Sequence, residues 1–220
     1  TCSSGTDALM LAIMAIDIQP GDEIITTPFT WISAAEIIAL LKAKPVFVDI
    51  EPDTFNIDAN LIEGVITKKT KAIMPVSLFG QPANLGTIQS IADKYNLKVI
   101  IDGAQSFGST YKNITDSNLG DISITSFFPS KPLGCYGDGG AVFTNNDEYA
   151  KKIKMLRVHG QTKRNYHKYI GIGGRLDTIQ AAILLAKLPH FSEELLARKK
   201  VANHYSDALS TIIKTPIIKS

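Results

Sequence analysis

Residues 98–102 read Lys98-Val99-Ile100-Ile101-Asp102, a short apolar run that ends on a carboxylate. Such a run is typical of a buried strand in a parallel sheet. The residues before it, from Leu85 to Tyr95, read as a helix. A helix that leads directly into a buried strand predicts one unit of an α/β fold, in which helices cover a central sheet.

The same alternation extends along the chain in both directions from this segment. Repeated strand–helix units predict a three-layer αβα sandwich with a mostly parallel central sheet, an α/β fold. Ligands of such sheets bind at the carboxyl ends of the strands, where Asp102 lies. We expect further helices at Gly5–Ile16, Ile32–Ala43 and Asp147–Val158, and further strands at Glu23–Thr27, Val46–Ile50, Ala72–Val76, Ile122–Phe128 and Gly140–Thr144.

The alternation is interrupted between Gln161 and Gly174. This segment is basic, aromatic and glycine-containing, so we expect an exposed functional loop. From Leu176 the pattern is helical to about Leu209, and Pro189 predicts a kink or break because proline cannot donate a helical hydrogen bond.

The composition excludes several classes of function. With 23 basic and 21 acidic residues the chain has no basic patch or run, which argues against a nucleic-acid partner. It has no apolar stretch of about 20 residues and no signal peptide, so no membrane association is expected. Two cysteines are too few for a disulfide framework and lack zinc-ligand spacing, which predicts no metal site and a cytoplasmic location. A first motif within five residues of Thr1 suggests an interior part of a longer protein.

Two segments carry polar groups that suit a phosphorylated, cationic ring. Ser3 to Ala8 opens a helix, and free amides at a helix start bind phosphate, although a plain cap formed by Ser4 or Thr6 would have the same sequence. Asp102 is followed by small residues and could pair with a protonated pyridine nitrogen. A helix-capping role for Asp102 remains the alternative.

Two further residues suit covalent chemistry and ring stacking. Lys131 lies between Pro129 and Pro132, beside aromatic residues, where desolvation would make its amine nucleophilic. The alternative is an ordinary surface lysine. Trp31, the only tryptophan, follows an expected strand and could stack on a flat ring or be a core or interface residue.

Together these features resemble the DegT/DnrJ/EryC1/StrS family of sugar aminotransferases, which are pyridoxal-phosphate enzymes of fold-type I. The resemblance covers about residues 1 to 210. The matching pieces occur in the family's order and read SSGTDAL, TPFTW, AKPVFVDI, IDGAQSFG, SFFPSKPLG, GDGGAVFT, LRVHG and GRLDTIQAAIL.

The resemblance assigns roles to particular positions. Lys131 matches the catalytic lysine that forms a Schiff base with pyridoxal phosphate, and Asp102 matches the catalytic partner of the pyridine nitrogen. Gln105 matches the residue near the phenolic oxygen of the ring. The other expected cofactor-binding residues form the phosphate cup and the stacking surface, and they are Gly5, Thr6, Ser126 and Trp31.

The resemblance also implies a reaction. An amino acid, glutamate in the family's manner, would donate its amino group to a keto group on a nucleotide-linked sugar. The region from LRVHG to QAAIL is similar to enzymes that aminate UDP-linked 3-keto-hexuronic acids for bacterial surface polysaccharide, such as lipopolysaccharide O-antigen. Arg175 would then grip the sugar carboxylate with two parallel hydrogen bonds. An ion pair between Arg175 and Asp177 or another nearby acid is the alternative.

The family pattern further implies a homodimer with shared active sites, in which the loop through Arg175 reaches the neighbouring subunit. Gly173 stands where the family often has an asparagine that binds the phosphate, and a glycine-rich anion nest would have to replace it. Residues 1–190 would be the cofactor-binding large domain, and residues 191–220 the start of the connection to a C-terminal small domain largely absent from this chain.

Two other functions remain open at this point. A sugar dehydratase of the same fold resembles the chain, but those enzymes carry histidine where Lys131 stands. A non-catalytic, pyridoxal-phosphate-binding fragment is the second alternative.

Overall fold

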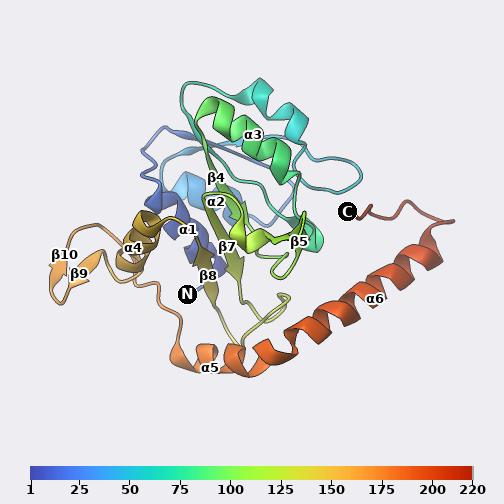
Figure 1. Cartoon of the computed structure of the whole chain (residues 1–220). Coiled ribbons are helices and arrows are strands. Elements are labelled where there is room, and N and C mark those ends of the chain that lie inside the picture. Colours follow the sequence, from blue (N-terminus) through green and yellow to red (C-terminus); the bar gives the residue numbers. More distant parts are fainter. Residues whose placement is uncertain (220) are drawn as a thin grey trace.

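The computed structural model describes residues 1–219 and contains a central six-stranded sheet (Figure 1). The strand order is β2-β1-β3-β4-β7-β8, and all neighbouring strands are parallel except the antiparallel pair β7 and β8. The mostly parallel sheet expected from the sequence is therefore confirmed. The strands are β1 (Glu23–Thr26), β2 (Lys44–Phe47), β3 (Thr70–Ile73), β4 (Lys98–Asp102), β7 (Ile122–Ser126) and β8 (Gly140–Phe143).

Helices cover both faces of this sheet, which gives the expected three layers. On one face, α1 (Gly5–Ala15), α2 (Ser33–Leu40) and α4 (Asp147–Leu156) share an apolar core with sheet residues such as Ile100 and Ile122. On the other face, α3 (Leu85–Tyr95) packs with residues such as Ile101, on the alternate side of β4. The side chains of β4 thus alternate between two cores, as expected for a strand buried on both faces.

Two strands begin and end two or three residues earlier than the sequence predicts. We expected β2 at Val46–Ile50 and β3 at Ala72–Val76, but pairing with β1 begins at Lys44 and at Thr70. β3 ends at Ile73, shortly before Pro75, which has no N–H to pair with a neighbouring strand.

Two small antiparallel hairpins were not predicted. One consists of β5 (Thr110–Tyr111) and β6 (Ile114–Thr115). The other, β9 (Gln161–Lys163) with β10 (Tyr166–His167), lies inside the segment expected as a loop and projects from the body of the molecule in Figure 1. The residues of this hairpin are largely exposed, as the sequence suggested.

The last part of the chain forms α5 (Thr178–Lys187) and α6 (Phe191–Leu209), separated by a 3₁₀ turn that contains Pro189. The break expected at Pro189 is confirmed. In Figure 1, α6 extends away from α5 along one edge of the molecule. Ser220, the last residue of the expected connecting segment, lies outside the described residues. Among residues 1–219, none of the helices combines the length and the apolar character needed to cross a bilayer.

Candidate active site

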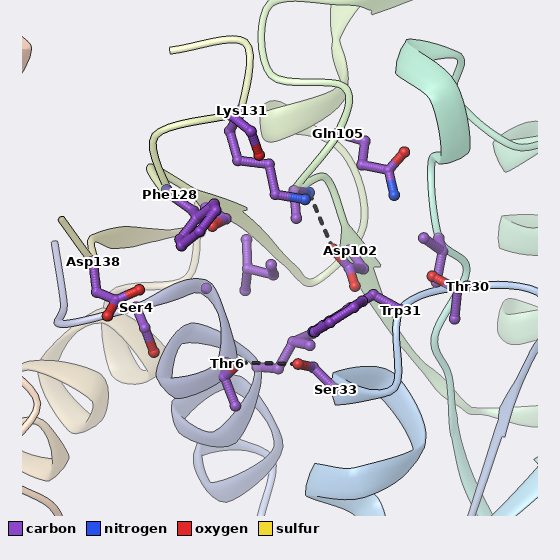
Figure 2. Close-up of a pocket in the computed structure, with 17 residues that line it drawn as sticks. Ser4, Thr6, Thr30, Trp31, Ser33, Asp102, Gln105, Phe128, Lys131 and Asp138 are labelled. Carbon is purple, nitrogen blue, oxygen red and sulfur yellow. Dashed lines mark hydrogen bonds between the residues drawn. The ribbon is translucent and has the colours of Figure 1, made fainter. Parts of the chain in front are cut away.

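A cavity of about 390 Å³ lies at the carboxyl ends of the central strands. It is bounded by the start of α1 and by the segments that follow β1, β4 and β7 (Figure 2). Parallel strands place their carboxyl ends at one edge of the sheet, so residues far apart in the sequence meet there. Seven of the eight predicted site residues line this cavity: Gly5, Thr6, Trp31, Asp102, Gln105, Ser126 and Lys131.

The first turn of α1 forms one wall of the cavity. The Ser4 side chain caps the helix by accepting a hydrogen bond from the Asp7 N–H at 3.0 Å. The amides of Gly5 and Thr6 precede the first intrahelical bonds and so remain available to an anion. A Cβ atom on Gly5 would lie 2.6 Å from the Cβ of Ser126, so only glycine allows α1 to approach β7 this closely. The Ser4 cap and free amides, which were alternatives in the sequence, are therefore both present at the same helix start.

Asp102 is the last residue of β4 and is only 7% exposed. Burial raises the pKa of this carboxyl, while a hydrogen bond from the Ala104 N–H at 3.0 Å and the positive charge of Lys131 act in the opposite direction. A buried carboxylate of this kind is stabilised by a cationic group placed next to it. The helix-capping role is not what the geometry favours, because Asp102 faces the cavity and no helix begins there.

Lys131 lies in the turn between β7 and β8. The turn is closed by a hydrogen bond from the Lys131 N–H to the Phe128 carbonyl at 2.9 Å. Gly134 permits it, because a Cβ there would lie 2.5 Å from the Pro129 carbonyl oxygen. Figure 2 shows the Lys131 side chain extending into the cavity in the direction of Asp102.

Trp31 and Gln105 border the cavity from the segments after β1 and β4. Trp31 is 70% exposed, so it is not a core residue, and its ring is free to cover a flat ligand. The side-chain oxygen of Gln105 accepts a hydrogen bond from the Phe79 N–H at 3.0 Å. Thr6 and Ser33 are joined through their hydroxyl oxygens at 2.9 Å, which links α1 to α2 at the cavity wall.

Arg175 is the one predicted site residue that does not line this cavity. It is exposed, and within residues 1–219 it makes no ion pair with Asp177. Gly173, at the position of the family's asparagine, is exposed and is bridged to Val158. Neither residue reaches the cavity of its own chain.

Sequence reasoning missed several polar cavity residues. Ser33 was hidden at the start of an expected helix, and Asp138 lies in the glycine-rich run that follows Lys131. The only sequence signal for them was that Ser33 follows closely after Trp31 and Asp138 closely after Lys131. The others that were missed are Ser4, Thr30 and Ser130.

The residues of this cavity fit pyridoxal phosphate. An amine and a buried carboxyl face the same space, a helix start offers free amides for a phosphate, and an exposed indole stands at the edge. The layered α/β fold together with this set of groups defines the class of fold-type I pyridoxal-phosphate proteins.

The chain belongs to the DegT/DnrJ/EryC1/StrS aminotransferase family, whose profile matches residues 1–219. It is 54% identical over 220 residues to a UDP-2-acetamido-2-deoxy-3-oxo-D-glucuronate aminotransferase of Pseudomonas aeruginosa. That alignment covers 100% of this chain and 61% of the relative, so the chain spans about three fifths of the relative's length.

Solved structures of the family share the fold. A DegT DnrJ EryC1 StrS aminotransferase from Brucella abortus superimposes with a TM-score of 0.97 at 41% identity, over 100% of this chain and 61% of the other. The protein ntda from Bacillus subtilis, with bound cofactor PMP, superimposes with a TM-score of 0.91 at 36% identity, over 96% of this chain and 48% of the other.

Proposed function

We propose that the protein is a pyridoxal-phosphate-dependent transaminase that moves an amino group from an amino acid, glutamate, to a keto group on a nucleotide-linked sugar. The observation that carries this proposal is that Lys131 and Asp102 face one cavity above the start of α1. When bound, pyridoxal phosphate supplies a conjugated ring that accepts electrons from the bond being broken.

The residues of the chain bind and orient the cofactor and move the proton. The Lys131 amine would hold the cofactor, and once displaced by the amino group of the donor it would carry a proton between the substrate carbon and the cofactor. The Asp102 carboxylate keeps the pyridine nitrogen protonated. The amides of Gly5 and Thr6, with the Ser126 hydroxyl, hold the phosphate, and the Trp31 indole covers one face of the ring and excludes water.

We propose a UDP-3-keto-hexuronic acid as the sugar substrate, used for bacterial surface polysaccharide such as O-antigen. The identity to the Pseudomonas aeruginosa enzyme supports this choice. A carboxylate on the sugar would suit the Arg175 guanidinium, which is exposed and has no acidic partner within residues 1–219.

We propose that the active protein is a homodimer with shared sites, because Arg175 follows an exposed hairpin and lies away from the cavity of its own chain. Residues 1–190 would then be the large domain and residues from 191 the connection to a small domain. Both cysteines are free, which suits a cytoplasmic location.

The dehydratase alternative is disfavoured because Lys131, rather than a histidine, extends into the cavity. The non-catalytic alternative predicts cofactor binding without turnover. Supplying glutamate and a UDP-3-keto-hexuronic acid, and measuring the mass of the sugar product, distinguishes it from the proposed transaminase.

Borohydride reduction of the protein with pyridoxal phosphate tests the role of Lys131. Reduction should remove the visible band, and peptide mapping should find the label on Lys131. Lys187 provides the control, because its Nζ lies 2.6 Å from the Gly134 carbonyl oxygen on the same turn. We expect Lys187→Ala to retain the label and Lys131→Ala to lose it, and a label on another lysine would overturn the assignment.

A further inference from the structure

A short turn beside the cavity anchors one of the polar side chains that line it. The turn is η3 (Leu78–Gly80), and the Phe79 N–H within it donates to the side-chain oxygen of Gln105 at 3.0 Å. An N–H group can only donate, so its partner on Gln105 must be the oxygen and the amide cannot be flipped. The amide nitrogen of Gln105, which carries two N–H donors, is left for the cavity.

The backbone of Phe79 is held in an uncommon conformation. Its φ is +56°, in the left-handed region that residues other than glycine rarely occupy. Such a conformation persists only where the surroundings hold it, and such residues gather at functional sites. We therefore expect other groups of the protein to hold η3 in this conformation.

The first such group is Asn56, a buried side chain that is 2% exposed. Its oxygen accepts a hydrogen bond from the Leu78 N–H at 2.9 Å. Its nitrogen donates to the carbonyl oxygens of Gln81 at 2.9 Å and Pro82 at 3.3 Å. Asn56 thus binds the chain on both sides of Phe79.

The second group is an aromatic cluster of Phe29, Phe55 and Phe79. The Phe79 ring meets the other two rings edge-on, with centroids 6.5 Å from Phe29 and 6.0 Å from Phe55. Edge-to-face contacts at such distances are favourable. The ring of Phe79 is 65% exposed but packs against the two other rings on one side, while Asn56 holds the neighbouring backbone.

We infer that η3 is a positioning device for Gln105, in which the Phe79 N–H occupies the side-chain oxygen and thereby presents the amide nitrogen to the cavity as a hydrogen-bond donor. The inference rests on the proposed function. The ligand group that fits this donor is an anionic ring oxygen of the cofactor, which a donor stabilises relative to its protonated form. Phe79 is a positioning residue, because it acts through Gln105.

The first test is Gln105→Glu, read from the pH titration of the visible band of the protein with pyridoxal phosphate. Glutamate has the same shape and still accepts from the Phe79 N–H, but its carboxylate cannot donate to a ring oxygen. We expect the apparent pKa of the visible band to rise by about one unit, a tenfold change in the equilibrium. An unchanged or lowered pKa would overturn the inference.

The second test is Phe79→Gly, which relaxes the left-handed turn and removes the aromatic contacts. The pKa of the band should rise as it does in Gln105→Glu. The double variant should show no further rise, because both changes remove the same interaction, the one between the Gln105 amide and the cofactor oxygen. Lys42→Gly is the matched control, since Lys42 is likewise in the left-handed region, with a φ of +62°, but does not line the cavity. It should leave the titration unchanged.

The outcomes separate this inference from the proposed function. A wild-type protein that forms no visible band with pyridoxal phosphate overturns the proposed function and this inference with it. A normal wild-type band together with a Phe79→Gly titration that matches the one of Lys42→Gly overturns the inference alone. If Phe79→Gly does not fold, Phe79→Leu, which keeps the N–H but loses the aromatic contacts, takes its place, and a titration equal to that of wild type overturns the inference.

Discussion

At the scale of single residues, we expect the charge of Asp102 to have the largest electrostatic effect on the proposed reaction. Replacing it by asparagine keeps the shape and removes the charge that would hold the pyridine nitrogen protonated. We expect Asp102→Asn to fold and to retain cofactor, while the half-reaction with glutamate slows by about a hundredfold or more, because a charge placed where electrons accumulate is a large catalytic contribution. Stopped-flow absorbance of the half-reaction measures this change.

Asp121→Asn is the control for that variant. Asp121 accepts hydrogen bonds from the Lys98 ammonium at 3.0 Å and the Val99 N–H at 2.9 Å, at the opposite end of β4. It should cost stability without slowing the half-reaction. A half-reaction of normal speed in Asp102→Asn would contradict the role given to Asp102.

A second buried acid, Asp116, gives a pH dependence of stability. It is 1% exposed, it accepts a hydrogen bond from the Ser106 hydroxyl, and burial raises its pKa to about 6. Between the unfolded pKa of 3.8 and about 6, the folded protein binds this proton more tightly than the unfolded chain does. The contribution of Asp116 to stability therefore falls as pH rises through that window, by about 3 kcal/mol in total.

Asp116→Asn should remove this contribution to the pH dependence. Urea unfolding across the window should show the variant gaining stability relative to wild type as pH rises. Asp58→Asn, a change at a partly exposed carboxylate that caps a 3₁₀ turn, should leave the slope as in wild type. A constant difference between Asp116→Asn and wild type across the window would contradict the prediction.

At the scale of elements, the close approach of α1 to β7 shapes the expected phosphate site. In Gly5→Ala the new Cβ would meet the Ser126 Cβ at 2.6 Å, so the helix must move away from the strand. We expect weaker binding of pyridoxal phosphate and a loss of about 1–3 kcal/mol of stability, typical of overpacking. Spectroscopic titration and thermal melting measure the two effects.

Gly64→Ala is the matched control, because a Cβ there meets no atom within 4 Å and its φ is not in the left-handed region. It should change neither affinity nor melting temperature by much. Unchanged affinity in Gly5→Ala would show that the amides of this helix start do not hold the phosphate.

Elements with strong local signals were predicted best. β4 and α3 have the bounds that the sequence predicts, because each is an uninterrupted apolar or helical pattern with polar neighbours. The bounds of β2 and β3 depend on which residues pair with β1, and that is not encoded locally. The β5–β6 hairpin was missed although Lys112 and Asn113, both with positive φ, form its turn.

The residues of the predicted site also differ in how far local sequence reveals them. Asp102 and Lys131, which line the cavity, could be proposed from the sequence because a strand end and a proline-flanked turn are visible there. Phe79 was not, since it contributes a backbone N–H, and any residue except proline has one. Its left-handed φ depends on Asn56 and on the aromatic cluster, which only the folded chain brings together.

At the scale of the whole molecule, the position of Arg175 outside its own cavity leads to a test of shared sites. Subunits with Lys131→Ala keep their Arg175, and subunits with Arg175→Ala keep their Lys131. If sites form across a dimer interface, mixing the two inactive variants should restore about one complete site in each mixed dimer. Turnover of the mixture and the mass by light scattering measure this outcome.

The control is each variant mixed with itself, which should remain inactive at every ratio. A protein that is monomeric and shows no complementation would contradict the shared site. Complementation would also give Arg175 a function in catalysis that its position in the single chain does not reveal.

The exposed position of Trp31 also has a practical consequence. It is the only tryptophan in the chain, and its indole stands at the edge of the cavity. Intrinsic tryptophan fluorescence of this chain therefore comes from one place, the mouth of the expected cofactor site. A ligand that covers the indole would alter its emission directly, so the chain carries a built-in optical reporter of its own occupancy.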